Sequence, residues 1–159
     1  MLIRLAEPSE HRGIVKAAIT GVQNHERAVV GDPVQPTEDA IESYLQYLMH
    51  RVVTKDGLIL VAEIDGRIVG TLIGYTDEDD DYLVQAEFNR FAFISDLYVI
   101  PEMRRRGIAK KLITRFNELM RERGFPWVRI FVKSKNRGAL ESYLKYGFEE
   151  YETVLAVRL

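Results

Sequence analysis

Residues 94–109 read ISDLYVIPEMRRRGIA, and no other stretch says as much about the architecture of this chain. An apolar run ends at Pro101, an arginine-rich loop follows, and a helical pattern begins near Arg106. This order predicts a strand, a turn and a helix whose start lies beside three guanidinium groups. Backbone N–H groups at a helix N-terminus and arginine side chains both bind phosphate groups. The sequence therefore predicts a polyphosphate site at the start of this helix.

Two motifs in the chain resemble signatures of the GNAT acetyltransferase superfamily. The first, Arg104-x-x-Gly107-x-Ala109, is similar to the acyl-CoA-binding motif Gln/Arg-x-x-Gly-x-Gly/Ala. The second runs from Asn136 through Tyr143 to residues 147–148, in the order and at the spacing of that superfamily. The resemblance covers residues 1–159 and implies one α/β domain. It implies a mixed, mostly antiparallel central sheet, helices on both faces, and a splayed pair of parallel strands at the cofactor site.

The apolar periodicity of the chain predicts the element order β-α-α-β-β-β-α-β-α-β. Strands are expected over residues 2–5, 58–64, 68–75, 91–99, 127–132 and 148–159, and helices over about 9–22, 37–52, 106–123 and 139–146. Gly31, Pro33 and Pro36 are expected to separate the first two helices, and Thr37 is the expected N-cap of the second. The Asp65-Gly66 pair predicts a tight hairpin, because both residues of such a turn take positive φ. Gly124 is expected to end the long helix in the left-handed conformation.

The composition restricts the chemistry that is open to this chain. Its 159 residues include no cysteine, which excludes disulfides, thiolate metal sites and a cysteine nucleophile. Three scattered histidines lack the spacing of metal ligands. The net charge of −2 does not indicate the basic surface that nucleic-acid-binding proteins carry. No segment approaches the ~18 uninterrupted apolar residues of a membrane span, and no signal-type run opens the chain. A cytoplasmic protein without metal, nucleic acid or membrane is therefore expected.

The resemblance implies that acetyl-CoA is the cosubstrate. It assigns cofactor binding to the end of the strand, the loop, the helix N-terminus and the second motif. These residues are Leu97, Tyr98, Val99, Arg104, Arg105, Arg106, Gly107, Ile108, Ala109, Lys110, Asn136 and Tyr143. Backbone groups of 97–99 would bind pantetheine, while small residues in the loop let a pyrophosphate approach the backbone. Asn136 also suits an N-cap of the helix that follows it.

Tyr143 matches the tyrosine that protonates the departing CoA thiolate in this superfamily. A phenol with a pKa of about 10 can supply that proton to a thiolate whose acid has a pKa near 8.5. Tyr146 is the alternative if the register of the helix differs. Asp96 is the candidate base, since an amine with a pKa of about 10.4 must lose a proton. Relatives often carry Glu one position earlier, where this chain has Ser95, so a structural role for Asp96 stays equally open.

The acceptor is the least determined part of the prediction. Residues 77–81 are all acidic and are expected in a loop where relatives shape the acceptor entrance. Such a run is either solvated surface or an attractor of cations. The predicted function is an N-acetyltransferase that acetylates a small cationic amine by direct attack, with a backbone N–H near Val99 stabilising the oxyanion. The alternatives are a non-catalytic acyl-CoA sensor, a protein N-terminal or lysine acetyltransferase, and nucleic-acid binding through residues 104–106. The superfamily often dimerises, so a homodimer is expected.

Overall fold

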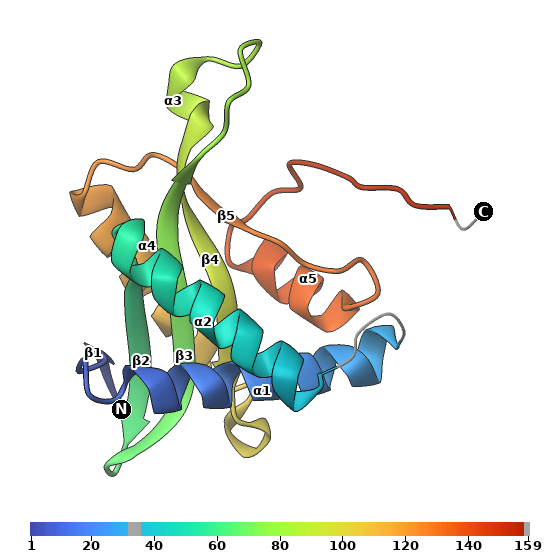
Figure 1. Ribbon diagram of the computed structural model, residues 1–159. Coiled ribbons are helices and arrows are strands. Elements are labelled where there is room, and N and C mark those ends of the chain that lie inside the picture. The colour runs from blue at the N-terminus through green and yellow to red at the C-terminus, as the bar shows by residue number, and fades with distance from the viewer. Residues whose placement is uncertain (32–35, 158–159) are drawn as a thin grey trace.

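A mixed β-sheet flanked by helices forms the protein, described here for residues 1–31 and 36–157 of a computed structural model (Figure 1). Within these residues the strand order is β1-β2-β3-β4-β5, and only the β4–β5 pair is parallel. The strands are β1 (Leu2–Leu5), β2 (Leu58–Ile64), β3 (Arg67–Glu78), β4 (Arg90–Val99) and β5 (Val128–Ile130). The helices are α1 (His11–Val30), α2 (Glu38–Thr54), α3 (Ala86–Asn89), α4 (Ile108–Glu122) and α5 (Arg137–Lys145), and η1 (Pro101–Met103) is a single 3₁₀ turn. The predicted α/β architecture is confirmed.

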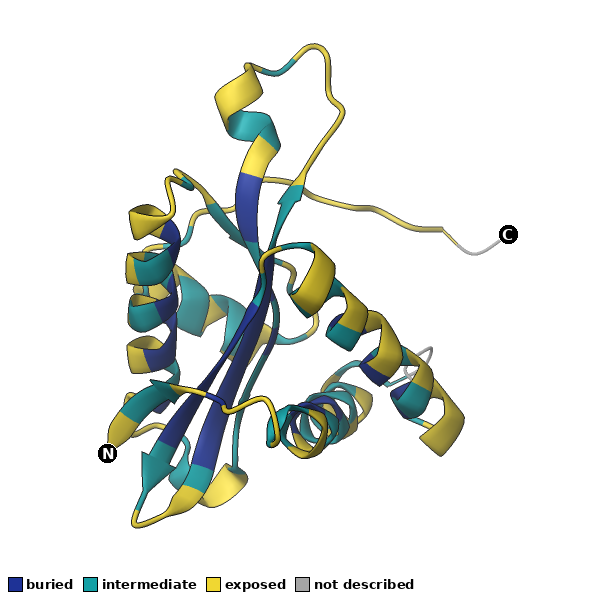
Figure 2. Ribbon diagram, turned by 60° about the vertical axis from the view of Figure 1, so that its left-hand side comes forward, coloured by how far each residue is buried: buried dark blue, intermediate teal, exposed yellow. Residues whose placement is uncertain are grey.

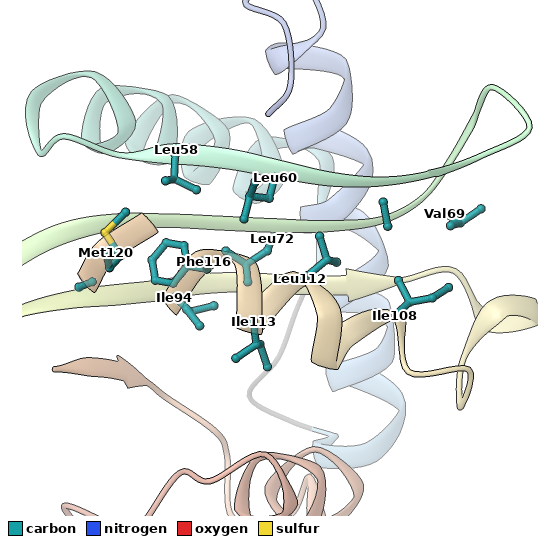
Figure 3. Packing of buried hydrophobic residues seen from close by; sticks show 12 residues of the cluster. Leu58, Leu60, Val69, Leu72, Ile94, Ile108, Leu112, Ile113, Phe116 and Met120 are labelled. Carbon is teal, nitrogen blue, oxygen red and sulfur yellow. The ribbon is translucent and has the colours of Figure 1, made fainter. Parts of the chain in front are cut away.

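The sheet lies between two apolar cores, because successive strand residues face opposite sides. Leu60 points toward α4 and packs with Leu112 and Phe116 (Figure 3). Its neighbour Ile59 points the other way and packs with Leu45 and the rest of the α1–α2 layer. The strands between the two helical layers are accordingly buried along most of their length (Figure 2). This arrangement fixes the two faces of β4, the strand that carries the candidate site.

Local turn and cap signals form as the sequence predicts. Asp65 and Gly66 take φ values of 50° and 76°, so the tight hairpin between β2 and β3 is confirmed. Gly124 takes φ 82° just after α4, which confirms the left-handed helix end. Thr37 caps α2, because its hydroxyl accepts a hydrogen bond from the Ala40 N–H at 3.2 Å. Gly31 follows the last residue of α1 with φ 76°, whereas Pro33 lies outside the described residues.

The cap of α2 allows a simple test of stability. We expect Thr37→Ala to lower the free energy of unfolding by about 1 kcal/mol, because the Ala40 N–H loses its hydrogen-bond acceptor. Urea denaturation followed by circular dichroism measures this change. Thr37→Ser retains a hydroxyl and is expected to stay within a few tenths of a kcal/mol of the wild type. Equal losses in both variants would contradict the capping role.

Several element boundaries differ from the predicted ones. Helix α1 continues to Val30, well past the apolar pattern that indicated it. Strand β3 extends to Glu78, so the first two residues of the acidic run are paired with β4 rather than looped. Strand β5 covers only Val128–Ile130 of the expected 127–132. Backbone hydrogen bonds to a neighbouring strand, more than side-chain type, determine where β3 and β5 end.

The predicted C-terminal strand is wrong for the residues that the structure describes. Residues 148–157 form no strand and extend away from the sheet (Figure 1). Tyr151, Val154, Leu155 and Val157 are exposed there, although their types favour strands. A strand needs a partner for its N–H and C=O groups, and no described strand pairs with this segment. Residues 158 and 159 of the predicted strand lie outside the described part of the chain.

Candidate active site

A β-bulge at Ser95 determines which way the site faces. Across the β3–β4 ladder Ile73 pairs with Asp96, but the next residue, Gly74, pairs with Ile94, so Ser95 is one extra residue in β4. The Ser95 hydroxyl donates to the carbonyl of Ile73 at 3.1 Å. Regular alternation would place Asp96 on the same face as Ile94, toward α4. The bulge turns Asp96 to the α1–α2 face instead, where it meets the side chain of Tyr44.

Beyond the bulge β4 and β5 separate. Only Ala92–Ile94 of β4 pair with Val128–Ile130 of β5, after which the two strands diverge (Figure 1). A cleft of about 590 Å³ opens between them. Most residues predicted to bind the cofactor line this cleft: Leu97, Tyr98, Val99, Arg104, Arg105, Gly107, Ile108, Ala109, Asn136 and Tyr143, together with the candidate base Asp96. Arg106 and Lys110 do not line it; both are exposed, at or near the start of α4.

One end of the cleft has the backbone geometry of an anion site. Gly107 caps the N-terminus of α4 with φ 75°, and Arg105 also takes a positive φ of 61°. A Cβ atom at Gly107 would meet no other atom within 4 Å, so the backbone here is open to a ligand. Free N–H groups of the first helical turn point toward such a ligand. This end of the cleft suits a phosphate group.

Arg104 also has a structural role. Its Nε donates to the carbonyl of Val99 at 3.0 Å, and its guanidinium lies 5.9 Å from the centroid of the Tyr98 ring. It therefore ties the loop to the end of β4. The Val99 carbonyl, one of the backbone groups predicted to serve pantetheine, already accepts this one hydrogen bond.

Asn136 caps helix α5. Its Oδ1 accepts a hydrogen bond from the Ala139 N–H at 3.3 Å, which confirms the structural reading of this residue. The same side chain lines the cleft, so a cofactor contact remains compatible with the cap. That contact stays a prediction.

Tyr143 faces the cleft from α5. Its ring packs edge-on against Phe148, with centroids 5.9 Å apart. Burial, with a smaller contribution from the negative charges of Asp96 and Glu26, raises the pKa of Tyr143 to about 12. The hydroxyl consequently keeps its proton at neutral pH and is available as a donor. Tyr146 also lines the cleft, so the two tyrosines remain to be distinguished by substitution.

Asp96 is nearly buried, with 3% of its surface exposed. The hydroxyl of Tyr44 donates to its Oδ2 at 2.9 Å. Burial raises the pKa of Asp96 to about 6, although the hydrogen bond from Tyr44 lowers it. A carboxyl with this pKa can take up a proton near neutral pH, unlike an ordinary aspartate. The sequence motifs do not mark Tyr44, because this contact depends on how α2 packs on the sheet.

Helix α1 forms one wall of the cleft because Gly21 lets it approach β4. A Cβ atom at Gly21 would lie 2.3 Å from ring atoms of Tyr98, so any larger residue would have to displace this ring or push the two elements apart. The close approach brings Val22, His25, Glu26 and Val29 of α1 to the cleft. None of these residues carried a signal in the sequence, since they belong to no motif.

The buried carboxyl predicts a pH dependence of stability. The pKa of Asp96 is raised from 3.8 to about 6 in the folded protein, so between these values the folded state holds a proton that the unfolded state has lost. This contribution to stability is full below the unfolded pKa and is lost as the pH rises through the folded pKa. We expect Asp96→Asn, which cannot ionise, to gain stability relative to the wild type between about pH 4 and about pH 7. Urea denaturation at both pH values measures the difference, and a pH-independent difference would contradict the raised pKa.

The acidic run lies away from the cleft. Asp77 pairs with Arg51 and Lys55 at 3.5 and 3.3 Å, and Asp79 pairs with Arg129. None of residues 77–81 lines the cleft, and the segment with α3 projects beyond the far ends of β3 and β4 (Figure 1). Cations of the chain already balance two of its five carboxylates. Attraction of an acceptor by this loop stays a prediction.

Two features are absent from the described residues. No group of three or more His, Asp or Glu side chains is arranged to hold a metal ion in residues 1–31 and 36–157. No helix within the same ranges is long and apolar enough to cross a membrane.

The splayed strands and the glycine-capped helix match what the sequence motifs imply, and the comparison with known families agrees. The chain belongs to the acetyltransferase (GNAT) family, whose model matches residues 12–148. Membership in this family supports an acyltransferase activity for this protein.

Individual relatives extend the comparison. An uncharacterized N-acetyltransferase of Methanocaldococcus jannaschii is 35% identical over 111 residues, which are 70% of this chain and 46% of that protein. The chain thus spans about half the length of that relative. A variant of the BH1408 protein from Bacillus halodurans has the same fold, with a TM-score of 0.82, 18% identity and full coverage of both chains. An aminoglycoside 6'-N-acetyltransferase from Acinetobacter haemolyticus gives 0.70 at 18% identity, covering 100% of this chain and 98% of that one.

Proposed function

We propose that this protein is an acetyl-CoA-dependent N-acetyltransferase that acetylates a small cationic amine by direct attack. One observation carries the proposal: a single cleft joins the open turn at Gly107 to the hydroxyl of Tyr143. The turn suits the pyrophosphate of CoA, and the hydroxyl suits a departing sulfur. A cosubstrate bound in this way would extend along residues 97–99, on the side of β4 that faces away from β3 and that β5 leaves unpaired.

The side chains of the cleft supply the proton transfers of this reaction. The amine nitrogen forms a bond to the thioester carbonyl carbon while the carbon–sulfur bond breaks. Tyr143 donates its proton to the departing sulfur, and a backbone N–H near Val99 stabilises the oxyanion. The amine nitrogen becomes far more acidic once it is bonded to the carbonyl carbon, and Asp96 then accepts its proton. Tyr44 holds the Asp96 carboxyl in place by its hydrogen bond.

Thiol release tests this function directly. Acetyl-CoA is incubated with the protein and a panel of straight-chain amines, amino acids and peptides with free N-termini or lysines. We expect release of free CoA with the small amines and the matching acetylated product in the mass spectrum. Binding of acetyl-CoA without release in the presence of any amine would instead indicate an acyl-CoA sensor. Acetylation of the peptides alone would indicate a protein acetyltransferase.

We further propose that residues 1–159 act as one catalytic domain and that two copies associate. The family model spans most of the chain, which supports the first part. The exposed apolar residues of the C-terminal segment, among them Val154 and Leu155, supply a surface for the second. Light scattering of the purified protein at several concentrations measures the association.

A further inference from the structure

An ion pair joins α1, which forms one wall of the cleft, to the segment that follows β5. The Lys133 Nζ donates to the Glu26 Oε2 at 2.5 Å, although the two residues are 107 positions apart. The Glu26 side chain is 15% exposed and lines the cleft, whereas the Lys133 side chain is 48% exposed. A shielded carboxylate therefore meets an ammonium group that reaches it from the surface.

Glu26 lines the same cleft as Asp96 and Tyr143, the two groups proposed to transfer protons. Its negative charge contributes to raising the pKa of both Asp96 and Tyr143, so Glu26 lies within electrostatic range of these two groups. The three side chains come from three different elements, α1, β4 and α5. Glu26 is thus placed to interact with whatever occupies the space beside the reacting atoms.

The charge of Glu26 restricts what it can usefully bind. The amine that attacks a thioester must be neutral, so a carboxylate attracts it little at the moment of reaction. A carboxylate does attract a charge that persists throughout the reaction, and it does so more strongly when it is shielded from water. The Lys133 ammonium is such a charge, and it shows that the place accommodates a cation on a flexible chain.

We propose that Glu26 binds a second, non-reacting cationic group of the acceptor, and that Lys133 occupies this position until the acceptor displaces it. This assignment rests on the acetyltransferase function proposed above and adds the class of its acceptor. The acceptor carries a reacting amine and, on the same molecule, an ammonium or guanidinium group. Glu26 is then a residue that determines specificity, and Lys133 is an internal competitor.

The two halves of the ion pair are expected to have opposite effects on kinetics. The probes are a straight-chain diamine and the monoamine of the same chain length. We expect Glu26→Gln to lower kcat/KM for the diamine by about 10-fold, since a hydrogen bond to a charged group is lost. The monoamine is the reference probe, because any effect of Glu26 on Asp96 and Tyr143 changes kcat/KM for both probes alike, and the ratio of the two kcat/KM values then reports the lost contact. We expect Lys133→Met to lower the KM for the diamine by about 3-fold, because the competitor is gone.

A purely structural bridge would behave differently, since both substitutions would then impair the protein in the same direction. The pair Lys16–Glu38, at 2.5 Å between α1 and α2 and outside the cleft, supplies matched controls. Lys16→Met and Glu38→Gln are expected to leave all kinetic constants unchanged. Turnover with an unchanged diamine preference in Glu26→Gln, or a raised KM in Lys133→Met, overturns this assignment alone. Absence of thiol release from every amine with the wild-type protein overturns the proposed function itself.

Discussion

We expect Tyr143→Phe to lower kcat by about 10²-fold while the affinity for acetyl-CoA changes little, because general acid catalysis contributes at least that much. The substitution keeps the ring and its edge-on contact with Phe148, so packing is preserved. Only the hydroxyl that faces the cleft is removed. Steady-state kinetics with a small amine measures kcat, and titration calorimetry measures the binding of acetyl-CoA.

Tyr146→Phe is the matched control, because Tyr146 lines the same cleft three residues further along the chain, at the C-cap of α5. We expect this variant to keep nearly all activity. If Tyr146→Phe proves damaging and Tyr143→Phe harmless, Tyr146 is the proton donor. If neither change lowers kcat, the leaving sulfur takes its proton from elsewhere.

We expect Gly107→Glu to remove the increase in melting temperature that acetyl-CoA causes in the wild-type protein. A ligand that binds only the folded state stabilises it by RT ln(1 + [L]/Kd), about 2.7 kcal/mol at a concentration of 100 Kd. The glutamate adds bulk and negative charge to the open turn at the N-terminus of α4, where the proposed pyrophosphate site lies. Thermal denaturation with and without acetyl-CoA measures the shift.

Gly124→Glu separates loss of the site from strain in the backbone. Gly124 takes φ 82° at the other end of α4, and a Cβ atom there also meets no other atom within 4 Å. Both substitutions therefore carry the cost of a side chain at positive φ. We expect the Gly124 variant to melt at a lower temperature and still to respond to acetyl-CoA. An undiminished response in the Gly107 variant would refute the phosphate site.

The sequence predicted those features that short stretches of chain determine by themselves. The Asp65-Gly66 turn, the Thr37 cap and the left-handed Gly124 each depend on a few neighbouring residues, and all three are confirmed. The C-terminal strand was predicted from residue types alone, and it is absent over residues 148–157 because no described strand pairs with it. Strand formation depends on a partner that propensity does not reveal.

The site was predicted only where a motif marks it. The turn at Gly107 and the cleft-facing Tyr143 follow from spacing along the chain. The orientation of Asp96 depends on the register between β3 and β4, and the alternation of residues along β4 does not reveal the bulge in this register. The place of Glu26 depends on the close approach of α1 to β4 at Gly21, a contact between distant parts of the sequence. Features of this kind can be recognised only once the folded structure is known.

The bulge makes the orientation of the site depend on how β4 pairs with β3 rather than on residue types alone. If Ser95 took a regular place in the ladder, every following side chain of β4 would be rotated by half a turn. Asp96 would then point into the apolar layer beneath α4, while Leu97 would face the helices on the opposite side. A substitution at this position changes one hydroxyl group, but a ladder that included Ser95 without a bulge would exchange the interior of the protein with the wall of its cleft.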